Sequence, residues 1–178
     1  MRISDDRYSR DLLRYEVARR LIRHQARTRT IRAWTGLTPD RIRKLYRTYP
    51  PTERVHRRRG KSPQRTSFFL HSHRRKFETG VMASLLSIFE VLPPKHGEES
   101  PNTLRSVGRG GSLCDAFEAF VAMLPASAFT LEHAELLLVA LIIGEELRAA
   151  ECAQCNGLVV VDPLSLLPPC CEQCRGTV

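Results

Sequence analysis

Four cysteines near the C-terminal end place the strongest geometric constraint on how this chain can fold. They form two Cys-x2-Cys pairs, Cys152 with Cys155 and Cys171 with Cys174, with fifteen residues between the pairs. This spacing is typical of a four-cysteine zinc site, because two residues between cysteines let one tight turn direct both sulfurs at the same ion. Since thiolates would fill all four ligand positions, we expect one Zn²⁺ with a structural role and no open position for water.

Two further cysteines have to be placed. Cys170 is adjacent to Cys171 and is an alternative ligand, but only Cys171 keeps the two-residue spacing to Cys174. Cys114 has apolar neighbours on a predicted helix and is expected to be a buried thiol. Redox chemistry and chance clustering remain as alternatives to a metal. The run Leu158-Val159-Val160-Val161 predicts a short strand that leaves the first cysteine pair.

Residues 30–49 predict a short helix, a tight turn and a second helix. Ile31 and Trp34 are three residues apart and share one helical face. Gly36 follows, and glycine adopts most easily the left-handed backbone that such a turn needs. Thr38 precedes a proline and an aspartate, which is typical of a helix start. This is the pattern of a helix-turn-helix DNA reader.

The second of these helices has an apolar stripe and a basic face. The stripe recurs at i, i+3, i+4 and i+7 and consists of Ile42, Leu45, Tyr46 and Tyr49. The cations that we take as candidate DNA contacts are Arg41, Arg43, Lys44 and Arg47. A basic helix face seated on an apolar one fits major-groove docking, although a solvated face of an ordinary packing unit has the same pattern. Arg32 fits poorly, because helix-turn-helix motifs usually hold a small residue there.

The charge is unevenly distributed along the chain. Residues 1–76 hold 23 Lys+Arg and 6 Asp+Glu, a balance of +17, whereas residues 77–178 hold 5 and 13, a balance of −8. Arginine outnumbers lysine 24 to 4. The planar guanidinium suits phosphate and guanine edges, although a GC-rich genome would give the same bias. The basic half therefore suits a polyanion as its partner.

Residues 50–76 are predicted to form a basic arm or linker. The arm contains the candidate backbone contacts Arg57, Arg58, Arg59 and Lys61. Phe68-Phe69 is the expected anchor of this segment in the core. A basic arm beside a helix-turn-helix commonly contacts phosphates or a minor groove, and the alternative is an unstructured linker whose charge is incidental.

The remaining pattern indicates a mainly α protein. A first helix is expected over residues 11–27. Another is predicted from Phe77 to Leu92, with an apolar stripe of Val81, Leu85, Ile88, Phe89 and Leu92. Residues 95–111 read as a polar loop closed by Gly108, Gly110 and Gly111, and the next helix would run from Ser112 to Leu124 with a capping box of Ser112 and Asp115. The longest helix is expected from Thr130 to Ala150. The expected units are a three-helix unit (1–49), the arm (50–76), a helical core for partner binding (77–150) and the zinc module (151–178).

Membrane and enzyme classes receive no support. The longest apolar run, Leu136 to Ile143, is shorter than the roughly 18 residues that span a bilayer and predicts a buried helix. The N-terminus is charged and offers no apolar signal region, so we expect a cytoplasmic protein. No catalytic triad signature, metalloprotease motif or nucleotide-binding glycine loop occurs. Glu145 and Glu146 are adjacent on a predicted helix and point different ways, so we do not expect an enzyme.

With these parts in place, the chain resembles the FlhC family of flagellar transcriptional activators from about Tyr15 to Cys174. The residues that carry the resemblance are Leu37 to Tyr46 (LTPDRIRKLY), then Pro50-Pro51 and Ser67-Phe68-Phe69. The resemblance implies that Cys152, Cys155, Cys171 and Cys174 are zinc ligands. It further implies a hetero-oligomer with an FlhD-like subunit, contact with double-stranded DNA, and recruitment of RNA polymerase. Relatives on conjugative elements activate transfer genes, so flagellar and conjugative-element promoters are both expected targets.

Two other classes remain open at this point. An RNA-binding or ribosome-associated zinc-ribbon protein would also be basic and hold four cysteines. The basic segment lacks the interleaved aromatic residues that stack on unpaired bases, which counts against RNA. An assembly protein whose basic face binds an acidic partner is the third class.

Overall fold

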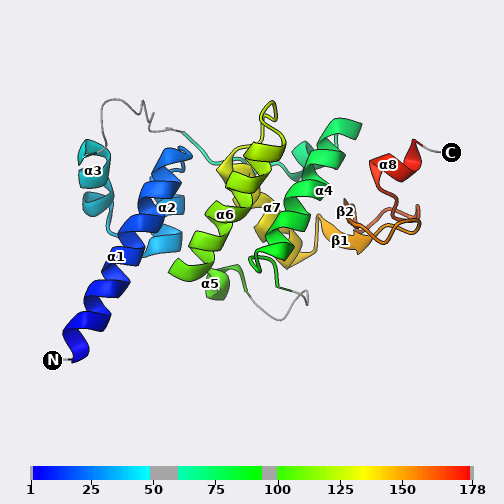
Figure 1. Cartoon of the computed structure of the whole chain (residues 1–178). Helices are drawn as coiled ribbons and strands as arrows, with labels where there is room; N and C mark the ends of the chain where they lie inside the picture. The colour runs from blue at the N-terminus through cyan, green and yellow to red at the C-terminus, as the bar shows by residue number, and fades with distance from the viewer. Residues whose placement is uncertain (1, 49–59, 94–99, 177–178) are drawn as a thin grey trace.

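The computed structural model describes residues 2–48, 60–93 and 100–176, and its architecture is mainly helical, as predicted. Helices α1 to α3 lie at one end of the molecule and the two strands with α8 at the other (Figure 1). Within these ranges, no helix is both long and apolar enough to cross a bilayer. The elements are α1 (Arg2–Arg23), α2 (Thr28–Thr35), α3 (Pro39–Thr48), a 3-10 turn η1 (Thr66–Phe69), α4 (His73–Ile88), α5 (Pro101–Leu104), α6 (Val107–Met123), α7 (Leu131–Ile143), β1 (Arg148–Glu151), β2 (Leu158–Val161) and α8 (Glu172–Arg175).

The first three helices pack on one another and form the predicted three-helix unit. Helix α2 buries Ile31 and Trp34 on its inner side. It ends at Gly36, whose φ of 68° is the left-handed conformation that the turn requires. Helix α1 is longer than expected toward the N-terminus and ends at Arg23 instead of continuing to residue 27, with Gln25 in a left-handed conformation at its exit.

Helix α3 begins and packs as its sequence predicted. The Oγ1 atom of Thr38 accepts a hydrogen bond from the backbone N–H of Arg41 at 3.4 Å, which caps the helix start. Ile42 is fully buried, and Leu45 and Tyr46 are partly buried against the core. The Tyr46 hydroxyl donates to the carbonyl oxygen of Ala26 at 3.2 Å and ties α3 to the α1–α2 connection. Tyr49 of the predicted apolar stripe lies outside the described residues.

One hydrophobic core runs from the three-helix unit into the rest of the chain, and α6 forms the junction. The prediction of a polar loop over residues 95–111 was wrong where α5 occupies Pro101–Leu104 and where α6 begins at Val107. Ser106 caps it by accepting a hydrogen bond from the N–H of Arg109, so the predicted capping box of Ser112 and Asp115 lies inside the helix. A Cβ atom on Gly110 would lie 3.2 Å from a methyl of Val17 and 3.4 Å from the Cβ of Trp34. Gly110 therefore serves the close packing of α6 against α1 and α2.

Helix α4 was predicted from Phe77 to Leu92 and runs from His73 to Ile88, so both of its ends lie four residues earlier than predicted. Its first turn begins at His73, because the Ser72 side chain caps the N–H of Arg75. Met82, Leu86 and the polar Glu78 and Thr79 are among its buried residues, whereas Ile88 of the predicted apolar stripe is 71% exposed. Phe69 is fully buried just before α4, which confirms the predicted aromatic anchor.

The predicted long helix over residues 130–150 is shorter. Thr130 caps α7 as expected, but Gly144 ends it in a left-handed conformation with a φ of 74°. The chain then forms β1, which pairs antiparallel with β2 so that Arg148 faces Val161 and Glu151 faces Leu158. The predicted strand over Leu158–Val161 is confirmed, and β2 packs against α4.

Candidate metal centre and nucleic-acid interface

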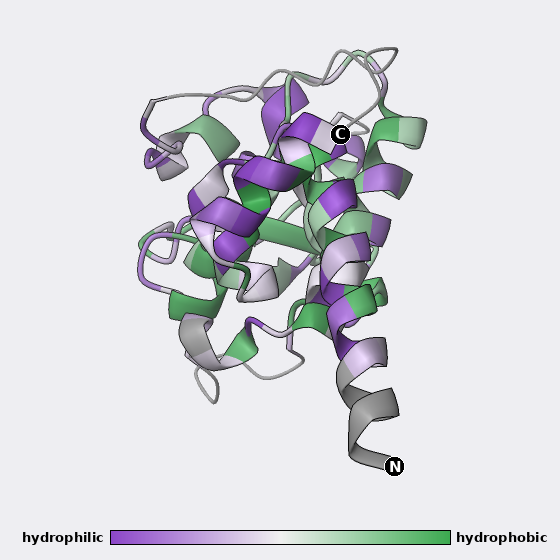
Figure 2. Cartoon of the chain, turned by 90° about the vertical axis from the view of Figure 1, so that its left-hand side faces the viewer, coloured by the Kyte–Doolittle hydropathy of each residue, from purple (hydrophilic) through white to green (hydrophobic). Residues whose placement is uncertain are grey.

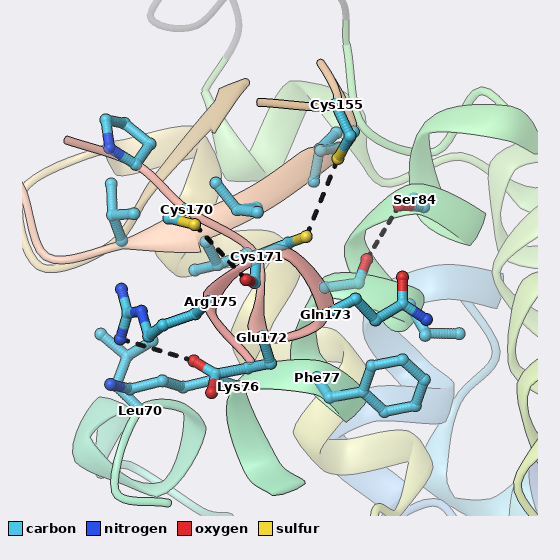
Figure 3. A pocket seen from close by; sticks show the side chains of 18 of the residues that line it. Leu70, Lys76, Phe77, Ser84, Cys155, Cys170, Cys171, Glu172, Gln173 and Arg175 are labelled. Carbon is cyan, nitrogen blue, oxygen red and sulfur yellow. Dashed lines mark hydrogen bonds and ion pairs between the residues drawn. The ribbon is translucent and has the colours of Figure 1, made fainter. Parts of the chain in front are cut away.

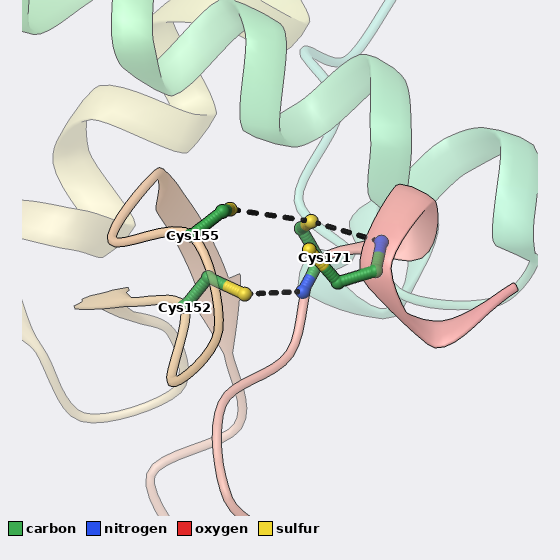
Figure 4. Close-up of side chains that lie close together, drawn as sticks. Cys152, Cys155 and Cys171 are labelled. Carbon is green, nitrogen blue, oxygen red and sulfur yellow. Dashed lines mark hydrogen bonds between the residues drawn. The ribbon is translucent and has the colours of Figure 1, made fainter. Parts of the chain in front are cut away.

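The two strands and α8 bring the four predicted ligands together. Cys152 directly follows β1, and the turn that contains Cys155 is closed by a hydrogen bond from the N–H of Cys152 to the carbonyl oxygen of Gly157 at 2.8 Å. Asn156 adopts a left-handed φ of 58° in this turn. Cys171 is the N-cap of α8, and Cys174 lies within that helix (Figure 4). Each pair is thus held by its own short turn.

The geometry of the sulfur atoms fits one metal ion. The four Sγ atoms of Cys152, Cys155, Cys171 and Cys174 all lie within 4.8 Å of one another, and those of Cys155 and Cys171 are 3.7 Å apart. A tetrahedral Zn²⁺ with Zn–S bonds of about 2.3 Å separates its sulfurs by about 3.8 Å. A disulfide would require about 2.05 Å, and all six cysteines are free thiols. The donor set and spacing are consistent with zinc.

Backbone amides prepare one of these thiols for a metal. The N–H of Cys171 donates to the sulfur of Cys152 at 3.3 Å, and this bond with those from the 154–155 backbone lowers the pKa of Cys152 to about 5. The pKa of Cys174 is raised, because its thiol hydrogen-bonds to the sulfur of Cys171. Metals bind the thiolate form, so a thiol that ionises below neutral pH favours metal capture.

Cys170 is not part of the cluster, which agrees with the preference for Cys171. Its thiol points to the carbonyl oxygen of Cys171 at 3.6 Å, and burial raises its pKa. It lines a groove of about 740 Å³ between α4, β2 and the 162–171 loop (Figure 3). The sequence reasoning missed this groove, although the apolar run Leu164 to Pro169 was a visible signal. Exposed apolar side chains along it are Phe77, Ile88, Met123, Leu164 and Leu167.

The predicted DNA-contacting cations of α3 all lie on its solvent side. The side chains of Arg41, Arg43, Lys44 and Arg47 are exposed. Arg43 forms an ion pair with Asp40 at 2.7 Å, and both side chains remain more than half exposed. Figure 2 shows the molecule from this side, with hydrophilic residues along the helices nearest the viewer.

The arm is described only in part. Lys61 is exposed, whereas Arg57, Arg58 and Arg59 lie outside the described residues. Residues 74–76, which were assigned to the arm, belong to the first turns of α4. There Arg74 and Arg75 both pair with the buried carboxylate of Glu78, so part of the expected arm charge is used inside the fold.

Acidic side chains of α6 neutralise the inner side of α1. Arg20 contacts Asp115 at 2.6 Å and Glu118 at 2.8 Å, and the His24 ring lies 2.9 Å from Glu118. Burial opposes ionisation of Glu118, but the hydrogen bonds from Arg20 and His24 outweigh it and lower the pKa of this carboxyl. Cys114, beside this group, is buried, and desolvation raises its pKa to about 12.

A second contact joins the three-helix unit to α7. Glu132, almost fully buried, accepts a hydrogen bond from the backbone N–H of Arg27 at 2.8 Å. Glu135 accepts one from the Thr30 hydroxyl at 2.9 Å and pairs with Arg105 at 3.1 Å. The acidic side chains of α6 and α7 thus contact the inner side of the three-helix unit. Exposed cations of this unit, such as those of α3, lie on its outer side. Its residues 8–48 hold twelve Lys+Arg and three Asp+Glu, a balance of +9.

Comparison with known proteins gives no assignment. No protein-family model matches the chain, and no curated protein matches it either. The resemblance of residues 37–46 to FlhC therefore stays an expectation. The features of the chain that bear on its function are the cysteine cluster and the distribution of charge.

Proposed function

We propose that this chain is an FlhC-like, DNA-binding subunit of a transcriptional activator. The observation that carries the proposal is the arrangement of α3, whose apolar side is seated on the three-helix unit while four cations face solvent. A B-DNA major groove admits one α-helix, and arginine is the side chain that most often reads guanine there. In this proposal α3 enters the groove.

The contacts divide by element. Arg43, Lys44 and Arg47 of α3 contact bases or nearby phosphates, with Arg41 at the start of the same helix. Arg57, Arg58, Arg59 and Lys61 contact the sugar–phosphate backbone. Backbone contacts of this kind fix the position of a protein on the duplex, whereas base contacts select the sequence.

The C-terminal cluster has a structural part in this proposal. One Zn²⁺ is held by Cys152, Cys155, Cys171 and Cys174 and folds residues 151–176, which include β2 and α8, against α4. The chain acts in the cytoplasm with an FlhD-like subunit, recruits RNA polymerase at flagellar or conjugative-element promoters, and has no enzymatic activity of its own. The exposed basic helix and the four converging thiols support this assignment over a purely structural one.

The proposal is tested by selecting duplexes from a random pool with the full zinc-loaded chain, alone and with an FlhD-like subunit. Affinity for a selected duplex is then measured over a salt titration. If about six phosphates are neutralised, we expect it to fall about a thousandfold between about 50 and 200 mM salt. Failure to enrich any duplex sequence, with or without the second subunit, would refute the proposal.

A variant pair connects the result to α3. The triple substitution Arg43→Gln, Lys44→Gln and Arg47→Gln is expected to abolish the preference for the selected duplex over a scrambled one. Arg148→Gln, which changes an exposed arginine of β1 at the other end of the molecule, serves as the matched control and should bind normally. Single-stranded RNA added as competitor tests the alternative class. RNA that displaces the selected duplex at equal concentration would favour an RNA-binding protein.

A further inference from the structure

Helix α2 also presents cations to solvent. Its inner side consists of Thr30, Ile31, Trp34 and Thr35, all buried. Arg29 and Arg32 lie on the outer side and are exposed. Among the residues that the structure describes, neither guanidinium has an ion-pair or hydrogen-bond partner. Their position is therefore not explained by packing or by neutralisation within the fold.

The exposure of Arg32 explains how an arginine is accommodated where helix-turn-helix motifs usually hold a small residue. In a helix-turn-helix this position usually packs inside, where a guanidinium would be costly to bury without a partner. Here the inner positions are taken by Ile31 and Trp34, and Arg32 is rotated outward by its place in the helix. The carbonyl oxygen of Arg32 accepts the N–H of Gly36 at 2.9 Å, so the residue is one helical turn before the α2–α3 turn.

We propose that Arg29 and Arg32 are phosphate-contacting residues that fix the position of α3 on the duplex. This inference rests on the proposed function and adds a second helix to the site. Helices α2 and α3 pack on each other, and both turn their arginines away from the shared core. When one helix of such a pair lies in the major groove, the other crosses the adjacent backbone, where the ligand is a row of phosphodiesters. The arginine fork matches phosphate oxygens.

A phosphate contact and a base contact differ in measurable ways. Losing a phosphate contact weakens binding to every duplex alike and lowers the dependence of log affinity on log salt by about 0.9 for each contact. Losing a base contact changes the preference between sequences instead. The α2 arginines and the α3 cations should therefore give opposite patterns.

The experiment compares the full zinc-loaded chain with the double variant Arg29→Gln, Arg32→Gln. Fluorescence anisotropy measures binding to the selected duplex and to a scrambled duplex of equal length over a salt series. We expect the salt slope to fall by about 1.8 on both duplexes, with the affinity ratio between them unchanged. Arg148→Gln should leave slope and ratio unaltered. Because both arginines are exposed, thermal unfolding should match the unsubstituted chain.

The outcomes separate this inference from the proposed function. An unchanged slope in the double variant, in a chain that still selects DNA, overturns the role of α2 and leaves the activator proposal standing. A changed sequence ratio with an unchanged slope overturns it as well, because it makes these residues base readers. If the unsubstituted chain binds no duplex, both proposals fall together.

Discussion

The two ends of this molecule differ in what converges inside them: apolar side chains at the N-terminal end and four cysteine sulfurs at the C-terminal end. The three-helix unit at the N-terminal end is fixed by burial, since Val17, Leu21, Ile31 and Trp34 enter the same core as α6. The cysteine module at the C-terminal end has two four-residue strands and one helical turn, and the loop between them exposes Leu164, Leu166 and Leu167. The buried apolar side chains of its strands are Val159 and Val160 of β2, which packs against α4.

This difference explains why the functional groups of the N-terminal end are at its surface, whereas those of the C-terminal end converge on one point. Because burial uses the inner sides of α2 and α3, the cations on their outer sides face solvent. In the cysteine module four thiols converge, and a bound metal would supply the folding free energy that a small module lacks. We expect substitutions in the cysteine module to affect metal binding and local order, and substitutions in the three-helix unit to affect the free energy of unfolding.

The largest effect is expected from metal removal. Chelation or Cys152→Ser should abolish metal binding and make residues 148–176 sensitive to proteolysis, because structural zinc sites contribute about 10–16 kcal/mol of apparent binding free energy. The helical circular dichroism of α1 to α7 should persist. Metal content and limited proteolysis check this. Cys170→Ser is the matched control and should retain one metal per chain; loss of the ion there would reassign the ligand set.

The next effect is expected at the junction of the three-helix unit with α6. Trp34→Ala should lower the free energy of unfolding by about 3–5 kcal/mol, because the indole is 2% exposed and its removal leaves a cavity. Chemical denaturation of the zinc-loaded chain measures it. Ile88→Ala, at a 71% exposed position, should change stability by less than about 0.5 kcal/mol. Equal effects of the two would argue against a shared core.

Two glycines of α6 test how closely this helix packs on the three-helix unit. Gly110→Val should destabilise the fold by about 1–3 kcal/mol, since new methyls would press on Val17 and Trp34. Gly108→Ala has no atom within 4 Å of the added Cβ and should stabilise the helix by about 0.5–1 kcal/mol. Thermal unfolding of both variants gives the signs. A stable Gly110→Val protein would mean that α6 can move away from α1.

The smallest effect concerns the ionic contact of α1 with α6. The pKa of Glu118 is lowered in the fold, so its stabilisation is present above the ordinary value of 4.5 and is lost as pH falls through the lower folded value. The stability difference between the unsubstituted chain and Glu118→Gln should thus shrink as pH falls below about 4.5. Its size should stay under about 1 kcal/mol, because the carboxylate is 39% exposed and solvent screens the pair.

Glu151→Gln, an exposed change in β1, is the control for this pH series and should track the unsubstituted chain. Denaturation at several pH values provides the data. A difference for Glu118→Gln that grows as pH falls below about 4.5 would contradict the assigned direction of the pKa shift.

The parts of the site that were predictable from the sequence depend on neighbours along the chain. Gly36 ends α2 because a left-handed residue is needed at that point, and Thr38 caps α3 because its hydroxyl reaches an amide three residues on. The convergence of each cysteine pair is also local, since two intervening residues define the turn. Such features are independent of what packs against them.

The sequence-based predictions were wrong where the conformation or burial of a residue depends on contacts with a distant part of the chain. Gly108 and Gly110 looked like a loop, but α6 continues through them because Gly110 meets Val17 and Trp34 from another part of the chain. Ile88 had the right spacing for a buried stripe and is exposed, because the rotation of α4 is set by its contacts with α6 and β2. Spacing alone does not define which side of a helix has a neighbour.

The sequence by itself therefore determined the α2–α3 turn, the helix caps and the pairing of the cysteines, since short-range backbone geometry and hydrogen bonds decide them. Only the tertiary structure decided which charges are available. The side chains of Arg20 and Arg27 pair with acids about a hundred residues away, Asp115 and Glu132, whereas Arg32 and Arg43 remain at the surface. The reason is physical: an arginine is equally basic in every sequence, and its partner is fixed by how the helices pack.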